Sequence, residues 1–142
     1  MIQFTVFGTP KPAGSKRAFV RGKRAMIVDA NPNAKDWKAG VAQAGAEAMA
    51  GRPLLDGPLV VGFAFYFPRP KGHTKADGTL NAKGRRTPYP NVKPDATKLV
   101  RGTEDALTGI IWRDDAQIVV QMATKHYGEP ARCEIIVSEA TP

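Results

Sequence analysis

The sequence predicts a single α+β domain in which a mixed or antiparallel sheet carries two helices. Strand-like segments alternate with two segments of helical periodicity in the order β-ββ-α-β-α-β-β. The length of 142 residues fits one hydrophobic core, so we expect residues 1–142 to form one domain. The hydrophobic content of 42% and the charged content of 24% are those of an ordinary globular protein.

Strands are expected to dominate the beginning of the chain. Ile2–Phe7 alternates and is rich in β-forming residues, and residues 8–15 have the composition of a turn. Ala18–Val20 and Ala25–Val28 are predicted as two short strands joined by a basic turn at residues 21–24. This region therefore predicts an N-terminal strand followed by a hairpin.

A helix and the most apolar strand follow. Asn31-Pro32 is a helix-start signal, Ala34–Ala50 has apolar residues near helical spacing, and Gly51-Arg52-Pro53 ends the pattern. Leu59–Phe67 is almost entirely apolar, which predicts a central strand of the sheet.

The second half begins with a basic segment and ends with two strands. Residues 69–93 have no apolar period, which predicts a long, flexible loop. Asp95–Gly109 is predicted as a helix with Gly109 as its C-cap. Gln117–Lys125 and Cys133–Val137 are predicted as strands. The expected buried face of the helix consists of Leu99, Thr103, Ala106, Leu107 and Ile110.

The charge distribution points to a polyanionic partner. The net charge is +8 and the isoelectric point is about 9.9. Residues 69–101 carry a net charge of +7 and residues 1–68 carry +5, whereas residues 102–142 carry −4. A basic N-terminal part followed by an acidic C-terminal part is typical of a nucleic-acid-binding protein with a separate carboxylate site, although a basic surface also serves solubility.

Several protein classes are disfavoured. The single cysteine, Cys133, excludes a disulfide within the chain and is expected to be a small apolar strand residue in a cytoplasmic protein. No apolar run reaches the length of a membrane span, and the N-terminus has no signal-peptide pattern. His73 and His126 lack neighbours at zinc-ligand spacing.

Three aspartates mark a candidate metal site. Asp95 precedes the second predicted helix, and Asp114 and Asp115 lie in the turn after it. Mg²⁺ is usually held by one or two carboxylates together with substrate phosphates. Lys98 and Arg101 lie on the same helix and could bind a phosphate. Whether the two ends of the helix meet is left open by the sequence.

Each part of this pattern also has a structural interpretation. Asp95 after a proline is a good N-cap, and the two later aspartates could form a solvated turn. Arg101 and Asp105 could form a surface ion pair, and Trp112 is better explained as a core anchor than as a base-stacking platform. The residues alone therefore indicate a basic nucleic-acid binder with a candidate metal site.

The same region resembles a known family. Lys93-Pro94-Asp95, Leu99, the segment Asp105–Gly109 and the segment Asp114–Ile118 are similar to the core of the RusA-type crossover-junction endodeoxyribonucleases. These small homodimers are common in phages and prophages. The resemblance implies Mg²⁺-dependent cutting of four-way Holliday junctions in DNA recombination and repair, with Mn²⁺ as an alternative ion. A two-fold dimer suits the approximate two-fold symmetry of a junction.

The resemblance also implies site residues. Asp95 matches the first helix aspartate of the family, Asp115 matches the catalytic member of the later pair, and Asp114 is its neighbour. Arg101 stands where the family has a functional lysine. Thr97 occupies the position of a second helix aspartate, which leaves open a junction-binding protein that has lost catalysis.

Glu104 and Asp105 are weaker candidates for the missing carboxylate, because they lie two or more turns along the helix. A basic RNA-binding module is a further alternative on composition. The residues expected to contact nucleic acid are Lys83, Arg85, Arg86, Lys93, Lys98 and Arg101.

Overall fold

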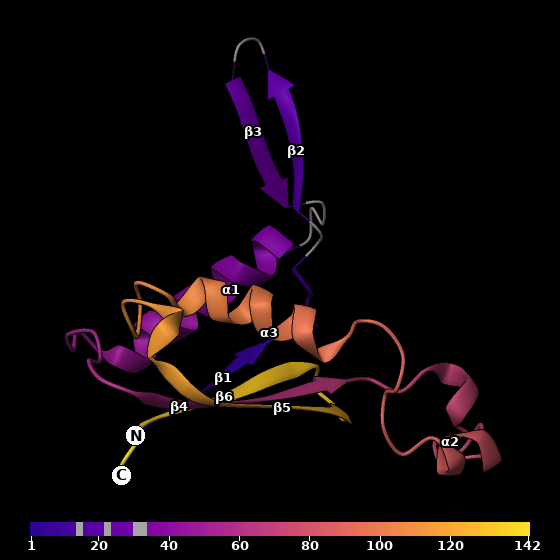
Figure 1. The fold of residues 1–142 in the computed structure, drawn as a ribbon. Helices are drawn as coiled ribbons and strands as arrows, with labels where there is room; N and C mark the ends of the chain where they lie inside the picture. Colours follow the sequence, from indigo (N-terminus) through magenta and orange to yellow (C-terminus); the bar gives the residue numbers. More distant parts are fainter. Residues whose placement is uncertain (14–15, 22–23, 30–33) are drawn as a thin grey trace.

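A mixed four-stranded sheet forms the centre of the protein. The computed structural model describes residues 1–13, 16–21, 24–29 and 34–142 (Figure 1). The strands of the sheet, in spatial order, are β1 (Ile2–Phe7), β6 (Arg132–Glu139), β4 (Leu59–Phe67) and β5 (Ile118–Tyr127). β4 and β5 are parallel, whereas β6 is antiparallel to both β1 and β4. The predicted α+β class and mixed sheet are confirmed.

Two helices cover one face of this sheet. Figure 1 shows α1 (Ala34–Met49) and α3 (Ala96–Leu107) side by side above the strands. The core lies between the two layers and contains the helix-facing residues of the strands, among them Phe63, Phe65 and Cys133. The expectation that Cys133 is a buried strand residue is confirmed, and burial raises the pKa of its thiol strongly.

A buried hydrogen bond fixes α1 against α3. Trp37 Nε1 donates to Thr103 Oγ1 over 3.0 Å, and both residues are buried. Gly45 allows close approach of the helices, since a Cβ at this position would lie 2.7 Å from a methyl group of Leu107. The predicted apolar face of α3 is confirmed at Leu99, Thr103 and Leu107, which are all buried.

The predicted hairpin is present as a separate two-stranded sheet. It consists of β2 (Lys16–Arg21) and β3 (Arg24–Asp29), which pair antiparallel (Figure 1). Gly22 and Lys23 of the basic turn, and the helix-start signal Asn31-Pro32, lie outside the described residues.

The basic segment 69–93 differs from the structureless loop expected from the sequence. It contains a 3₁₀ turn, η1 (Lys71–His73), and a short helix, α2 (Ala82–Arg86). Arg69 ties the segment together: its Nη1 donates to the carbonyls of Gly84 and Thr87 over 3.0 and 3.1 Å. Side-chain bonds to backbone carbonyls, rather than an apolar period, therefore shape this segment.

One edge of the sheet carries exposed apolar side chains. β5 is an edge strand, and Val119, Val120 and Met122 are 59%, 44% and 59% exposed. In the described part of the chain, no helix has the length and apolar character needed to cross a membrane.

Candidate active site

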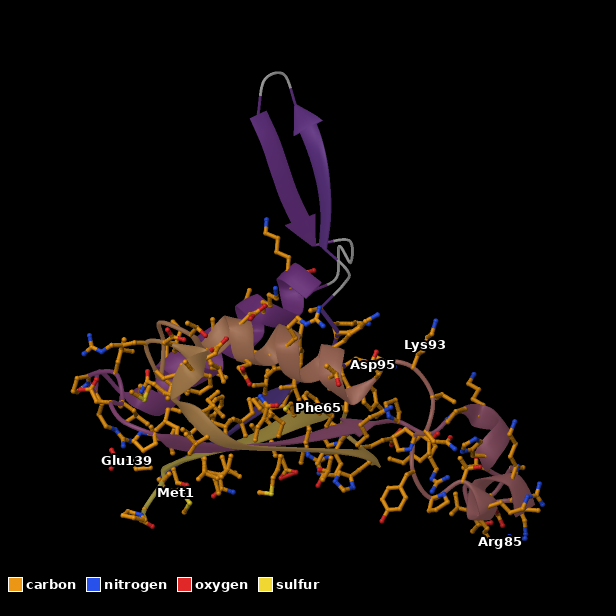
Figure 2. The ribbon with its side chains drawn as sticks, in the orientation of Figure 1. Met1, Phe65, Arg85, Lys93, Asp95 and Glu139 are labelled. Atoms are coloured by element: carbon orange, nitrogen blue, oxygen red, sulfur yellow. The ribbon has the colours of Figure 1, made fainter. Side chains whose placement is uncertain are left out.

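A basic cavity lies at the start of α3, beside Asp95. Its volume is about 460 Å³, and Figure 2 marks the positions of Lys93 and Asp95 at this end of the helix. The cavity is lined by Thr9, Pro10, Lys11, Pro12, Phe67, Lys93, Pro94, Asp95 and Lys98. The structure thus brings together three of the residues named from the sequence, Asp95, Lys93 and Lys98, and adds Lys11. Three lysines and one aspartate give the cavity a net positive charge, which favours an anion such as a phosphate.

Lys11 reaches this cavity because the chain after β1 crosses α3 at a glycine. Ala13 N donates to the carbonyl of Lys98 over 2.9 Å. A Cβ at Gly102 would lie 3.0 Å from Ala13 N and 3.3 Å from the Lys11 carbonyl. The contact joins residues about ninety positions apart, so the sequence contained no local signal for Lys11.

Asp95 is the N-cap of α3, as the structural interpretation of the sequence expected. Its Oδ2 accepts a hydrogen bond from the backbone N–H of Lys98 over 3.1 Å. No hydrogen bond found in the described part of the chain uses its Oδ1. Capping and cation binding are therefore compatible, because they use different oxygens of the same carboxylate.

Asp115 is anchored at the opposite end of α3. Its Oδ1 accepts hydrogen bonds from Trp112 Nε1 over 2.8 Å and from Thr108 Oγ1. Trp112 is fully buried, so the prediction of a core anchor is confirmed. Both bonds converge on one oxygen of Asp115.

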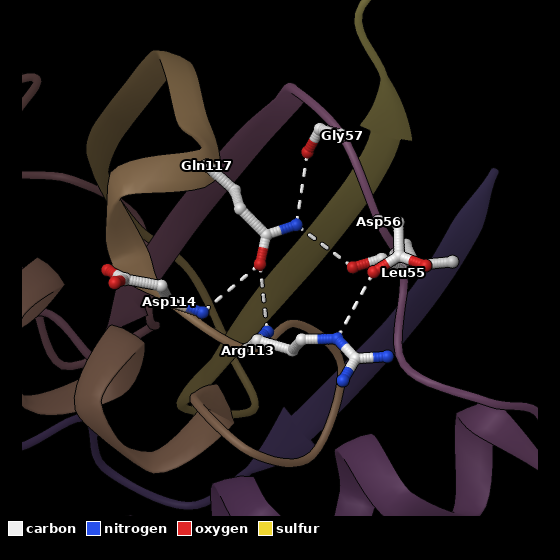
Figure 3. Close-up of polar contacts among 6 residues, drawn as sticks. All are labelled: Leu55, Asp56, Gly57, Arg113, Asp114 and Gln117. Carbon is white, nitrogen blue, oxygen red and sulfur yellow. Dashed lines mark hydrogen bonds and ion pairs between the residues drawn. The ribbon is translucent and has the colours of Figure 1, made fainter.

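Asp114 is held by the glutamine three residues later. Figure 3 shows Gln117 Oε1 accepting from the backbone N–H groups of Arg113 and Asp114, while its Nε2 donates to the carbonyls of Leu55 and Gly57. All four bonds are between 2.9 and 3.1 Å long. Gln117 therefore clamps the aspartate pair to the loop that precedes β4.

Glu104 lies beside Asp115, a proximity that the sequence did not predict. Its carboxylate accepts a hydrogen bond from Gln121 Nε2 and lies close enough to Asp115 for their charges to interact. Burial, followed by the negative charge of Asp115, raises the pKa of Glu104 to about 7. The turn after α3 folds back on the helix, which brings together carboxylates eleven positions apart.

The two groups of carboxylates do not meet within one copy of the chain. Asp95 and Asp115 lie at opposite ends of α3, whose 12 residues span about 18 Å. Within the described ranges there is no group of three or more Asp, Glu, His or Cys side chains placed to hold a metal ion. Arg101 is exposed and does not line the cavity. Asp105 pairs with Lys38 over 3.7 Å, so the considered Arg101–Asp105 pair is not formed.

The other basic residues named from the sequence lie on α2. Lys83, Arg85 and Arg86 are exposed there, and Figure 2 places Arg85 in the part of the basic segment far from Asp95. Arg69 has a structural role, with its guanidinium 4.5 Å from the centre of the Tyr127 ring. Arg85 also donates to the carbonyl of Leu80 over 2.9 Å, and the exposed cations of α2 can contact a long polyanion.

Comparison with known proteins identifies the family. The family model described as endodeoxyribonuclease RusA matches residues 8–138. YqaN of Bacillus subtilis (strain 168), an uncharacterised protein, is 30% identical over 142 residues, which cover 99% of this chain and 97% of the relative. The match includes the cavity at Asp95, the aspartate pair and the basic segment between β4 and α3. The chain belongs to the RusA family of endodeoxyribonucleases.

Proposed function

We propose that this protein is a Mg²⁺-dependent endodeoxyribonuclease that resolves Holliday junctions, or cuts related branched DNA, in recombination and repair. The main support is the cavity at Asp95, which is lined by this carboxylate with one oxygen free of hydrogen bonds and by three lysines, in a chain of the RusA family. A cation and a phosphate could both be bound there.

The lysines and the aspartates of the site have separate roles in this proposal. Lys11, Lys93 and Lys98 bind and orient the scissile phosphate in the cavity, and their charges balance the charge that develops on its oxygens. Asp95, which lines the cavity, would hold the ion, and Asp115 at the other end of α3 stays a predicted ligand. When bound, Mg²⁺ activates a water and stabilises the cleaved phosphodiester.

The chemistry of the donors fits such an ion. Mg²⁺ prefers carboxylate oxygens and retains several waters and substrate phosphates as ligands, so a pair of carboxylates suffices. In the described structure, hydrogen bonds use only Oδ2 of Asp95, Oδ1 of Asp115 and Oδ1 of Asp114. Each of the three proposed ligands therefore keeps an oxygen for a cation. Mn²⁺ has similar preferences and is expected to substitute.

DNA binding would extend beyond the cavity. Arg85, Arg86 and Lys83 on α2 contact the backbone of a junction arm, and shape rather than base edges selects the substrate. A homodimer and a cytoplasmic location stay predictions. The alternative function is a junction-binding protein with weak or no cleavage, since Thr97 offers a hydroxyl where the family has an aspartate.

Cleavage of a labelled four-way junction, compared with a linear duplex of the same sequence, tests the proposal. Reactions with Mg²⁺, Mn²⁺ or EDTA are run with the wild type and with Asp115→Asn. Asn keeps Oδ1 for the bonds from Trp112 and Thr108, so the variant removes charge without removing the anchor. Asp105→Asn is the matched control, because its carboxylate pairs with Lys38 outside the site.

The outcomes separate the two functions. Paired, metal-dependent nicks in the junction that disappear in Asp115→Asn and persist in Asp105→Asn support the nuclease. Tight junction binding without nicks in either metal ion supports the binding protein. Preference for RNA duplexes over junction DNA in competition would argue against both.

A further inference from the structure

A row of ring and guanidinium side chains crosses the sheet on the face that α1 and α3 leave open (Figure 1). Tyr66 on β4 is the cross-strand partner of Arg132 on β6 and of His126 on β5. Phe65, the residue before Tyr66, is buried in the core under the helices, so the alternation of a strand places Tyr66 on the opposite face. The row therefore lies at the end of the sheet where the parallel strands β4 and β5 both end.

The members of this row are stacked on one another. The Arg132 guanidinium lies 3.8 Å from the centre of the Tyr66 ring, and the centres of the Tyr66 and His126 rings are 4.9 Å apart. His126 Nε2 lies 2.8 Å from Thr124 Oγ1, which fixes the orientation of the imidazole. The ring of Tyr89 comes next, with its centre 6.3 Å from that of His126 and its plane tilted by 55°. Tyr89 ends the row and is 61% exposed.

The backbone around Tyr89 is restrained. Tyr89 lies between two prolines, which narrow the conformations open to it. On either side, the carbonyls of Thr87 and Val92 accept hydrogen bonds from Arg69 and Lys125 over 3.1 and 2.7 Å. An exposed ring on a restrained backbone loses little conformational entropy when a ligand stacks on it.

The chain around Tyr89 is also basic. Residues 83–93 contain no acidic residue and four basic ones, Lys83, Arg85, Arg86 and Lys93. Phe7, the other exposed aromatic ring in the described part of the chain, lies on β1 at the opposite edge of the sheet. Tyr89 is therefore the exposed ring that a nucleic acid bound by the basic segment would meet.

The cavity at Asp95 is within short reach of this ring. Lys93, which lines the cavity, follows Tyr89 by four residues, so their Cα atoms are at most about 14 Å apart. One strand of DNA rises about 3.4 Å per nucleotide, so this span corresponds to about four nucleotides. A base on Tyr89 would therefore lie within about four nucleotides of a phosphate in the cavity.

We propose that Tyr89 binds an unpaired base of branched DNA by stacking, and that this contact favours branched over linear DNA. The inference rests on the proposed function for its substrate, and on the stacked row and its basic surroundings for the binding site. In a linear duplex the base must first leave its pair and its stack, and that cost offsets the gain from the ring. A base that is already unpaired at a branch point avoids this cost.

Affinity measured in EDTA tests the contact without cleavage. The full-length protein is titrated against a labelled four-way junction and against a linear duplex of the same sequence. The variants are Tyr89→Ala and Tyr89→Phe, with Ile136→Ala as the matched control. Ile136 is exposed on the same open face of the sheet, but it lies four residues from Arg132 along β6, or about 13 Å from the row.

Tyr89→Ala should weaken junction binding about fivefold to a hundredfold, the range expected for one stacked base, and should change duplex binding less than twofold. Tyr89→Phe keeps the ring and should bind the junction as the wild type does, as should Ile136→Ala. The salt slope should stay unchanged in Tyr89→Ala, because no charge is lost. Equal losses for junction and duplex, no loss for the junction, or an equal loss in Tyr89→Phe would each overturn the inference.

Photocrosslinking locates the base. 5-Iodouracil is placed in turn at each of the four nucleotides on either side of the branch point, and the irradiated complex is analysed by mass spectrometry. We expect a cross-link to Tyr89 from at least one of these positions in the junction and from none in the linear duplex. A Tyr89 that is unlabelled from every position would contradict the proposed contact.

The inference and the nuclease proposal fail in different ways. If the wild type binds junctions and Tyr89→Ala loses the preference, but no nicks form with Mg²⁺ or Mn²⁺, the nuclease proposal fails and the inference stands. If the wild type cuts junctions and Tyr89→Ala binds and cuts them equally well, the inference alone fails. A wild type that binds branched DNA no better than linear DNA would also overturn the inference, whether or not it cuts.

Discussion

Replacing Thr103 with valine tests how α3 is held in the position that presents both ends of the site. Thr103 is 0% exposed and Trp37 is 6% exposed, and the indole donates to the threonine hydroxyl over 3.0 Å. Valine keeps the shape of threonine but removes the acceptor, so the indole N–H is left buried without a partner. The threonine hydroxyl also donates to the carbonyl of Leu99, which keeps its helical hydrogen bond in the variant.

The magnitude follows from this one orphaned donor. An unsatisfied buried polar group costs roughly 1–3 kcal/mol, and we expect a loss of about 2 kcal/mol in the free energy of unfolding. The entropy of unfolding for 142 residues is about 0.3 kcal/mol/K, so the melting temperature should fall by roughly 7 °C.

Chemical and thermal unfolding at one protein concentration provide the measurement. Thr97→Val on the same helix is the control, since it makes the same change at an exposed position. In a Trp37→Phe background, Thr103→Val should destabilise the protein much less than it does in the wild type, because phenylalanine has no N–H donor to leave without a partner. The reasoning fails if Thr103→Val is no more destabilising than Thr97→Val.

Four further predictions concern charge. Arg85→Ala/Arg86→Ala should weaken junction binding and lower the slope of log affinity against log salt by up to about 2, and an unchanged slope would remove α2 from the DNA surface. Lys11→Gln should reduce cleavage at least tenfold, as loss of a charge-assisted contact worth about 1.5–3 kcal/mol requires, and unaltered kinetics would exclude it from the site. Thr97→Asp should lower the Mg²⁺ concentration for half-maximal cleavage and stabilise the first turn of α3 by about 0.5 kcal/mol; titration and melting check both. The pKa of Glu104 in the folded state is about 7, so its contribution to stability is complete below about pH 4.5 and is lost as the pH rises through 7. Solvent screening of this half-buried group limits the loss to about 1 kcal/mol. Thermal melting from pH 4 to 8 should show this loss in the wild type and not in Glu104→Gln.

The residues predicted well from the sequence are those with local signals. Asp95 follows a proline at a helix start, and the N–H of Lys98 three residues later is the partner that such a cap requires. The two later aspartates were expected in a turn, and in the structure Asp114 caps a 3₁₀ turn as part of a capping box with Gln117 three residues later. In both places the interaction spans three residues, so the pattern is visible in the sequence.

The residues that were missed depend on tertiary contacts. Lys11 enters the cavity only because Gly102 lets the chain after β1 approach α3, and Glu104 reaches Asp115 only because the following turn folds back. Counting turns along the helix placed Glu104 far from the helix start, which is correct. It gave no information about the aspartate pair beyond the helix end.

The basic segment shows a different limit. Its sequence has no apolar period, yet Arg69 and Asn81 build a compact unit by donating to the backbone carbonyls of residues 72, 84 and 87. Gly84 is required there, because a Cβ would lie 2.3 Å from the carbonyl oxygen of His73. Hydrogen bonds of this kind leave no periodic trace in a sequence.

Thr97 reduces the number of carboxylates at the start of α3. Within one copy, the threonine leaves Asp95 as the one carboxylate that lines the cavity. A second group of carboxylates, Asp115 with Glu104 beside it, lies at the other end of α3, where the two charges interact. Binding of Mg²⁺ favours the ionised carboxylate, so Glu104→Gln should raise the metal concentration needed for cleavage, whereas Glu47→Gln on α1 should not.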